Sequence, residues 1–279
     1  MEQRETFTIR AARAEDRAAC VAAEQAAIAG PYYLGDVWEM FLADDGELTV
    51  AAGPDGTPVA VGKLTRLYGP HAWLETLRVL PACQGRGIGK DFYMRWFGRM
   101  AALGLTAVGM YTGAGNRVSR GLAERFGLTL RGTFAELACP AGAESGGRFA
   151  PVPPARGEAA AAPFYADMGG FLAVNRTFFP VRAGLGAELA RRGWLFESPE
   201  GALLVAGWRF QPQRAVHLAY CSGDAAAALA FASALARRAG AERISAIRET
   251  GQTEQTAALL RAGFADTGTR LITLWKGLK

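Results

Sequence analysis

The amino-acid sequence predicts an α/β protein of two domains, on three observations. Strand-like and helix-like patterns alternate through the first half of the chain. A stretch rich in Pro, Gly and Ala interrupts them at residues 139–163, and turn residues then recur at a fixed distance in the second half. Because 279 residues are comfortable for two domains, we expect a first domain at 1–138, a linker at 139–163 and a second domain at 164–279.

The elements of the first half follow from hydrophobic periodicity and turn residues. Two strand-like runs flank the turn PDGT, which indicates a hairpin. Pro81 ends a later strand. In chain order we expect a strand at 5–12, a helix at 14–28, strands at 47–53, 57–69 and 71–81, a helix at 90–104, a strand at 105–112, a helix at 117–127 and a strand at 128–137.

The second half repeats part of this plan. Gly104 corresponds to Gly240 at an offset of 136 residues (240 − 104 = 136). The same offset pairs Gly115 with Gly251, Arg125 with Arg261, Gly127 with Gly263, Gly132 with Gly268 and Thr133 with Thr269. Matches that cluster at turns indicate a duplicated domain. The offset fails before about residue 220, so an insertion or deletion is expected upstream.

The composition narrows the classes of function. The net charge of +5 is carried mainly by scattered arginines, without the basic stripe that a nucleic-acid site needs. The few cysteines and histidines make no CxxC pair or metal-ligand spacing, so we expect no metal and no disulfide scaffold. They are Cys20, Cys83, Cys139, Cys221, His71 and His217. No apolar run reaches the ~20 residues of a bilayer span and no signal peptide is evident, which predicts a cytoplasmic protein that does not enter a membrane.

Three glycines, Gly85, Gly87 and Gly89, fall where a strand gives way to a helix. Glycine costs about 0.5–1 kcal/mol against alanine inside regular structure, so this cluster needs a reason. A P-loop is excluded because Gln84 stands where its first glycine would be and Asp91 where its hydroxyl would be. A Rossmann turn requires GxGxxG, whereas this turn reads GRGIG.

The arrangement that fits is Gln84-x-x-Gly87-x-Gly89 between a strand and a helix. Backbone N–H groups there converge on an anion, and the helix N-terminus adds about half a positive charge. The strand LETLRV precedes the turn, and N-x5-L-x4-G-L follows it. In that order the residues resemble the GNAT superfamily of acyl-CoA-dependent N-acetyltransferases. The resemblance covers most of residues 5–137: LETLRVLPACQGRGIG is similar to the pyrophosphate-binding motif, and NRVSRGLAERFGL to the helix after it.

This resemblance implies an α+β mixed sheet in two GNAT-like domains, each a mixed twisted sheet flanked by helices. It also implies acetyl-CoA as co-substrate, with the pyrophosphate on the amides of the turn and the pantetheine arm along the preceding strand edge. The implied donor-binding residues are Leu77, Arg78, Val79, Gln84, Gly85, Arg86, Gly87, Ile88, Gly89, Lys90 and Asn116. Asn116 is equally suited to be a plain helix N-cap.

Glu75 is the candidate general base. An alkylammonium has a pKa near 10.4, and a carboxylate acting through water contributes typically ~10²–10⁴-fold to its deprotonation and attack. Period-two alternation predicts that Glu75 shares a face with Leu77 and Val79. By resemblance, the N–H of Val79 stabilises the oxyanion. The alternative is that Glu75 is a rim carboxylate without a role.

The sequence departs from the family pattern at the general acid. Family members commonly read N-x6-Y, with the tyrosine protonating the CoA thiolate, but seven residues after Asn116 this chain has Ala123. Tyr111 and Ser119 are the candidate replacements; the alternatives are buried packing for the tyrosine and an ordinary helix position for the serine. The loss favours a competing hypothesis, a non-catalytic acyl-CoA-binding regulatory or scaffold protein.

The second half is predicted to be degenerate. The offset places YCSGDA, residues 220–225, opposite QGRGIG, with Asp224 in the turn. A carboxylate there repels a pyrophosphate, so we expect no CoA at this half. It would instead complete the acceptor groove or form a homodimer.

We expect direct transfer in a ternary complex to the amine of a small molecule or peptide. Tyr32, Tyr33 and Trp38 either line the acceptor pocket or simply pack. The aromatic run at residues 163–180 is expected to be core and interdomain packing rather than a ligand cage.

Overall fold

The computed structural model describes residues 6–142 and 148–278. It divides into two compact units whose segments interleave. Unit 1 comprises Met1–Met110, Arg117–Thr129 and Leu274–Lys279, and unit 2 comprises Tyr111–Asn116 and Leu130–Thr273. The domains expected from the sequence, at 1–138 and 164–279, are contiguous, whereas these units are not. Residues 143–147 of the predicted linker, and residue 5 of the predicted first strand, lie outside the described residues.

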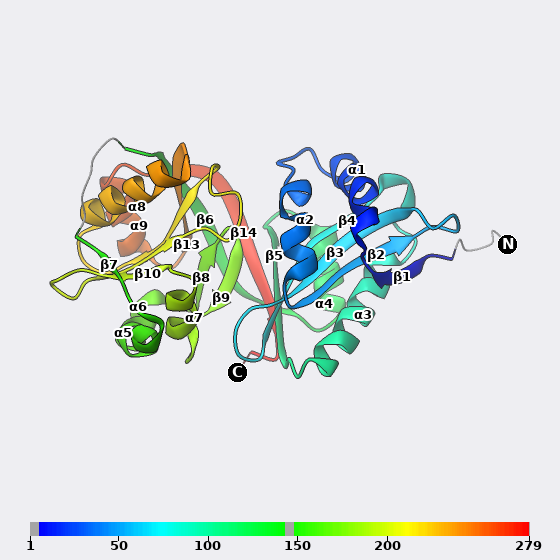
Figure 1. Cartoon of the computed structure of the whole chain (residues 1–279), viewed down its shortest axis with the longest axis horizontal. Coiled ribbons are helices and arrows are strands. Elements are labelled where there is room, and N and C mark those ends of the chain that lie inside the picture. Colours follow the sequence, from blue (N-terminus) through cyan, green and yellow to red (C-terminus); the bar gives the residue numbers. More distant parts are fainter. Residues whose placement is uncertain (1–5, 143–147, 279) are drawn as a thin grey trace. The chain divides into compact units, whose positions relative to one another are not determined.

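Unit 1 is a mixed sheet flanked by helices (Figure 1). Its strands follow the order β1-β2-β3-β4-β5, with the end of β14 (Ala265–Lys276) beside β5. The pairs from β1 to β4 are antiparallel, and β4–β5 is parallel. The elements are β1 (Thr8–Ala11), η1 (Ala14–Asp16), α1 (Arg17–Ala27), α2 (Leu34–Ala43), β2 (Gly46–Ala52), β3 (Pro58–Arg66), β4 (His71–Val79), η2 (Pro81–Cys83), α3 (Ile88–Ala102), β5 (Ala107–Gly113) and α4 (Arg117–Arg125).

Helices α2 and α3 lie on opposite faces of this sheet. A Cβ on Gly62 of β3 would lie 2.7 Å from the Trp96 ring of α3, so this residue faces α3. The next residue, Lys63, is fully buried and donates to the carbonyls of Phe41 and Asp44 at the end of α2, at 2.7 and 3.0 Å. Successive side chains of a strand alternate between faces, so we can assign a face to each neighbouring residue from these two.

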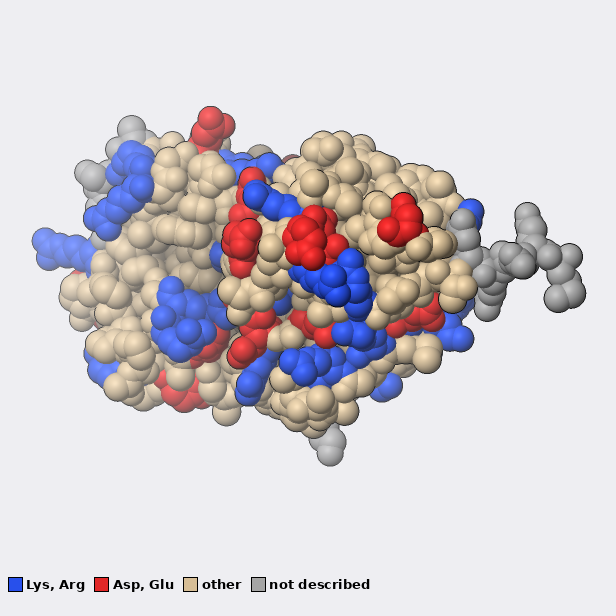
Figure 2. Space-filling view, turned by 45° about the vertical axis from the view of Figure 1, so that its right-hand side comes forward, with Lys and Arg blue, Asp and Glu red and all other residues tan. Residues whose placement is uncertain are grey.

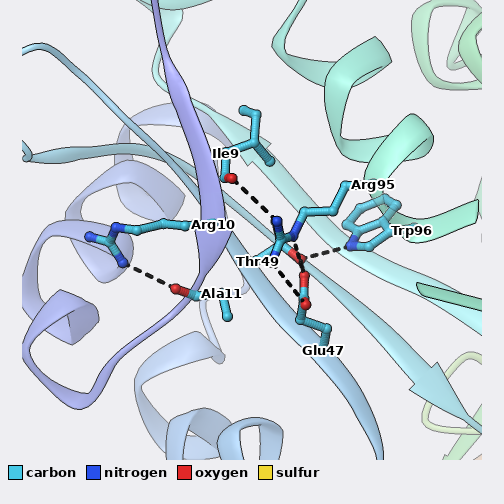
Figure 3. A network of polar contacts seen from close by, with 7 residues as sticks. All are labelled: Ile9, Arg10, Ala11, Glu47, Thr49, Arg95 and Trp96. Carbon is cyan, nitrogen blue, oxygen red and sulfur yellow. Dashed lines mark hydrogen bonds and ion pairs between the residues drawn. The ribbon is translucent and has the colours of Figure 1, made fainter. Parts of the chain in front are cut away.

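A polar network fixes α3 to the sheet (Figure 3). Arg95 of α3 donates to both carboxylate oxygens of Glu47 on β2, at 2.5 and 3.1 Å, and to the carbonyl of Ile9 at 3.3 Å. Thr49 donates to Glu47 at 2.8 Å and accepts from the Trp96 indole at 2.9 Å. The network holds the helix that begins directly after the glycine turn.

The last residues of β14 complete the core of unit 1. Trp275 is fully buried and packs on Trp73 with ring centroids 5.8 Å apart. Its ring fills the space above Gly109, where an added Cβ would lie 2.1 Å from Cε2. The carbonyl of Trp275 accepts from Thr129 Oγ1 at 3.3 Å. Only glycine at position 109 leaves room for this indole.

Unit 2 is also a mixed sheet, in the order β14-β6-β13-β12-β11-β10-β7, with a separate hairpin of β8 and β9. Only β12–β13 is parallel among its described strand pairs. Its elements are β6 (Thr129–Pro140), β7 (Ala150–Pro151), η3 (Pro154–Arg156), α5 (Gly157–Ala161), η4 (Ala162–Phe164), α6 (Tyr165–Met168), β8 (Phe171–Val174), β9 (Thr177–Pro180), α7 (Leu185–Arg191), β10 (Leu195–Glu197), β11 (Leu203–Gly207), β12 (Val216–Cys221), α8 (Ala225–Ala239), β13 (Arg243–Glu249), α9 (Thr253–Arg261) and β14 (Ala265–Lys276).

Much of the segment predicted as a linker is ordered structure of unit 2. Residues 150–164 form β7, η3, α5 and η4. The reason is close packing: a Cβ on Gly157 of α5 would lie 2.5 Å from the carbonyl oxygen of Gly186 in α7. Gly157 lies in the segment predicted as a linker, and its lack of a side chain allows two short helices to touch. The aromatic run is core, as expected, with Phe171, Phe178 and Phe179 buried.

The sequence repeat extends to whole elements. Strands β5 and β13 are related by 136 residues at both ends (243 − 107 = 136; 249 − 113 = 136). The same difference relates α4 to α9 (253 − 117 = 136) and β6 to β14 (265 − 129 = 136).

Within the described part of the chain, no helix is long and apolar enough to cross a membrane.

Candidate functional site

The glycine turn forms an exposed backbone cradle at the start of α3. Gly85 and Gly87 have φ of +75° and +94°, and an added Cβ at either would meet nothing within 4 Å. The positive φ requires glycine at both positions, and the absence of side chains leaves the backbone open to a ligand. The first intrahelical bond runs from Asp91 N to Gly87 O at 3.1 Å. The N–H groups of residues 88–90 precede it, so they point out of the helix end.

Position 89 requires glycine because of close packing. A Cβ there would lie 2.9 Å from Leu122 Cδ2 of α4 and 3.8 Å from Leu77 Cδ2 of β4. This glycine lets α3 approach its neighbours closely, which brings the cradle against the end of β4.

The end of β4 extends past its ladder with β5. The parallel ladder with β5 ends at Leu74↔Met110, and residues 75–79 extend beyond it. On the other side, Leu80 N donates to Val59 O at 2.9 Å. Because backbone groups alternate along a strand, the N–H and C=O of Val79 then point away from β3. The carbonyl of Val79 accepts from Gln84 Nε2 at 3.1 Å, which ties the edge to the glycine turn.

A β-bulge separates Glu75 from this edge. Lys63 pairs with Glu75 and Val61 pairs with Arg78, so Gly62 alone stands opposite two residues of β4. The extra residue shifts the alternation of side chains by one position. Glu75 thus lies on the α2 face with Lys63, whereas Leu77 lies on the α3 face against Gly89. The expectation that Glu75 shares a face with Leu77 and Val79 is wrong, and the bulge is the reason.

Glu75 is held on this face. It is 9% exposed, and its Oε1 accepts from Thr65 Oγ1 at 2.5 Å. Next to it in the bulge, Thr76 has φ of +61°. Such a conformation costs a β-branched residue on the order of 1–3 kcal/mol and persists only where its surroundings enforce it. Tyr33, from the segment before α2, hydrogen-bonds Thr76 Oγ1 through its hydroxyl at 2.7 Å.

The candidate acids lie in two environments. Tyr111 belongs to unit 2, where it packs on Phe178 with centroids 6.0 Å apart and hydrogen-bonds Arg176. Ser119 is half-buried on α4 in unit 1. Ala123, which stands at the family's tyrosine position, is fully buried. Asn116 is exposed in unit 2 and directly precedes α4, with its N–H donating to Gly113 O at 2.9 Å.

The corresponding region of unit 2 lacks the cradle. Residues 220 and 221 lie inside β12, so their predicted alignment with the turn is wrong. Eight residues separate β4 from α3 (88 − 79 − 1 = 8), but only three separate β12 from α8 (225 − 221 − 1 = 3). Asp224 Oδ1 accepts from Ala226 N at 2.8 Å, so a carboxylate already caps this helix.

The strand edge of β12 is also occupied. Arg248 of β13 is buried, and its guanidinium donates to the carbonyls of Ala219 and Leu218 on β12. The parallel ladder here covers only Val216↔Ile244 and His217↔Ser245. An arginine thus takes the backbone acceptors that lie past the ladder, in the position that is open on β4.

Other predicted candidates have structural surroundings. Trp38 is fully buried, Tyr32 is 40% exposed and Tyr33 is half-buried, so of the three only Trp38 is simply core.

Burial lowers the pKa of His217 to about 4, and His71 Nδ1 meets Tyr68 O at 3.0 Å. All four cysteines are unpaired. The described residues contain no cluster of His, Cys, Asp or Glu that could hold a metal.

Sequence reasoning missed the bulge and its contact with Tyr33. Thr76 carries no turn signature, and the two residues of the contact are separated by 43 positions.

On the face drawn in Figure 2, basic and acidic side chains are interspersed rather than gathered in a basic stripe.

Comparison with known proteins agrees with this geometry. Residues 14–128 match the acetyltransferase (GNAT) family model. A GCN5-related N-acetyltransferase from Sphaerobacter thermophilus is 16% identical and aligns over 97% of this chain and 95% of its own, with a TM-score of 0.63. A putative acetyltransferase from Pyrococcus horikoshii is 17% identical over 98% of this chain and 90% of its own, with a TM-score of 0.66.

A third structure, a glucosamine N-acetyltransferase region of a fungal multi-domain β-N-acetylglucosaminidase, is 14% identical and covers 99% of this chain and 38% of its own, with a TM-score of 0.66. At these identities the likeness shows the fold. No curated protein matches the chain. The residues that match the acetyltransferase (GNAT) family model contain the bulged strand, the glycine cradle and α4.

Proposed function

We propose that this protein is an acetyl-CoA-dependent N-acetyltransferase that moves the acetyl group directly to an amine in a ternary complex. The observation that carries the proposal is the open backbone cradle at Gly85 and Gly87 beside the end of β4, which extends past its ladder with β5. A helix end with unpaired N–H groups favours a pyrophosphate, and a free strand edge favours an amide-bearing arm such as pantetheine.

The donor would be held mainly by backbone groups. The amides from Gln84 to Lys90 would bind the pyrophosphate, with the exposed side chains of Arg86 and Lys90 adding positive charge. Leu77 to Val79 would pair with the arm. Asn116 remains a candidate for the same arm, alongside its position as the residue before α4.

In the proposed reaction, Glu75 takes the proton of the acceptor ammonium through a water molecule. The amine nitrogen then attacks the thioester carbonyl, and the N–H of Val79 stabilises the oxyanion. The C–S bond breaks, and the thiolate, with a pKa near 8.5 as a free thiol, is a tolerable leaving group even without an acid. Tyr111 and Ser119 remain the candidate acids.

One donor site per chain is proposed. The short turn after β12, the capping carboxylate of Asp224 and the guanidinium of Arg248 all oppose CoA binding in unit 2. The amine acceptor, from a small molecule or a peptide, the cytoplasmic location and a homodimer stay predictions.

A non-catalytic acyl-CoA-binding protein is the second candidate. The observation in its favour is Ala123, which is fully buried and replaces the tyrosine that would act as the general acid. The two candidates differ in turnover but not in donor binding.

The test is calorimetric titration with acetyl-CoA, followed by a screen of primary amines. One site per chain and acetylation of an amine that falls about 100-fold in Glu75→Gln, with donor binding kept, would support the enzyme. Binding without acetylation of any amine would support the regulatory protein. Absence of binding would refute both.

A further inference from the structure

We propose that Tyr33 is a positioning residue that aims Glu75 by holding the bulge of β4, an inference that rests on the proposed function. The bulge places Glu75 on the α2 face, opposite to the face of Leu77. Bulges next to active sites commonly re-aim a side chain in this way.

Thr76 does not hold its conformation by itself. A β-branched residue at φ of +61° is in a sparsely populated region, so a neighbour must enforce it. Thr76 is 5% exposed, and its Oγ1 meets Tyr33 Oη at 2.7 Å. The hydroxyl pair is a direct restraint on the residue next to Glu75.

Tyr33 is itself fixed by α1. Glu24 of α1, which is fully buried, accepts through Oε2 from the N–H groups of Tyr33 and Leu34, at 3.1 and 3.0 Å. The restraint therefore runs from the helical layer through Tyr33 and Thr76 to Glu75. From the sheet side, Thr65 holds the carboxylate oxygen at 2.5 Å.

Through Tyr33, the segment before α2 is linked to the proposed base. It restrains the residue next to the base, so an acceptor that moves Tyr33 also moves Glu75. Loss of the hydroxyl leaves the donor cradle untouched, because the cradle is made by the backbone of residues 84–90.

The experiment uses the full chain and an amine found in the screen. Tyr33→Phe should lower kcat about tenfold or more, since a displacement of about 1 Å at a reacting group can cost 100-fold, while the Kd for acetyl-CoA changes less than about twofold. Thr76→Ser, which keeps the hydroxyl, should retain activity. Thr76→Val, which keeps the branch and loses the hydroxyl, should match Tyr33→Phe. Tyr68→Phe is the control for hydroxyl removal elsewhere in unit 1.

A positioning role also predicts non-additivity. In a Glu75→Gln background, Tyr33→Phe should cause no further loss of kcat, because it acts through Glu75. Full activity in Tyr33→Phe, an effect on KM alone, or an equal further loss in that background would overturn the inference. If the wild-type protein acetylates no amine, the proposed function has failed instead, which is a distinct result.

Discussion

Arg95 of α3 and Glu47 of β2, 48 residues apart in the chain, form a two-point ion pair with N···O distances of 2.5 and 3.1 Å. Glu47 is 14% exposed and Arg95 35% exposed, so solvent screens the pair in part. We expect Glu47→Gln to lower the free energy of unfolding by about 1–2 kcal/mol, because charge-assisted bonds of this kind contribute on that order. Urea denaturation measures this. The exposed pair of Arg156 and Glu197 is the control, and Glu197→Gln should change little.

Gly87→Glu should abolish acetyl-CoA binding. The substitution puts a carboxylate and a strained φ of +94° at the cradle. Gly98→Glu is the matched control, since Gly98 is exposed on the same helix with open space around it and ordinary φ. Calorimetry on both variants, with circular dichroism to verify the fold, decides the question. Equal affinity in the two variants would remove the cradle from the donor site.

Gly109→Ala should destabilise the protein by about 3 kcal/mol, at the upper end of overpacking effects. Its Cβ would lie 2.1 Å from the Trp275 ring, which has no room to move within a filled core. Gly113→Ala, on the same strand with nothing within 4 Å, should be neutral. Thermal unfolding followed by circular dichroism measures the midpoint of each variant. An unchanged midpoint for Gly109→Ala would contradict the packing described here.

Lowering the pH from 7 to 5 should weaken the fold through His217. Burial keeps its folded pKa at about 4, against about 6.5 in an unfolded chain. Between these values the unfolded state binds the extra proton, so stability falls as the pH drops from 6.5 towards 4 and is constant above 7. The expected contribution at pH 5 is about 2 kcal/mol. Denaturant unfolding of wild type and His217→Gln at both pH values measures it, and parallel pH dependence in the two proteins would count against it.

Asp224→Ala should cost about 0.5–2 kcal/mol of stability, as the loss of a helix N-cap does, and should create no second donor site. Arg248 would still occupy the β12 carbonyls, and the turn before α8 would still be three residues long. The check is the stoichiometry of acetyl-CoA binding, which should stay at one per chain. A second site in this variant would show that the cap alone closes unit 2.

The features that the sequence predicts are those that depend on local chemistry. Glycines with positive φ, such as Gly127 and Gly263, end helices at the same point of each repeat, so the elements from β5 to β6 and from β13 to β14 follow from one offset. The turn between β4 and α3 is recognisable for the same reason.

The features that the sequence does not predict depend on distant partners. The conformation of Thr76 requires Tyr33, and the order of residues 150–164 depends on the approach of Gly157 to Gly186. The face of Glu75 was mispredicted because one inserted residue reverses the alternation of a strand. The turn of unit 2 was misplaced because an offset cannot show where residues have been deleted.

The contribution of β14 to unit 1 has a consequence for biosynthesis. Residues 274–279 belong to unit 1, although residues 130–273 of unit 2 separate them from the rest of that unit in the order of synthesis. Until these residues leave the ribosome, Gly109 and Trp73 lack the indole that covers them. During synthesis, unit 1 therefore keeps this apolar surface exposed while residues 130–273 are translated, and its core is completed only after that segment of unit 2 has been made.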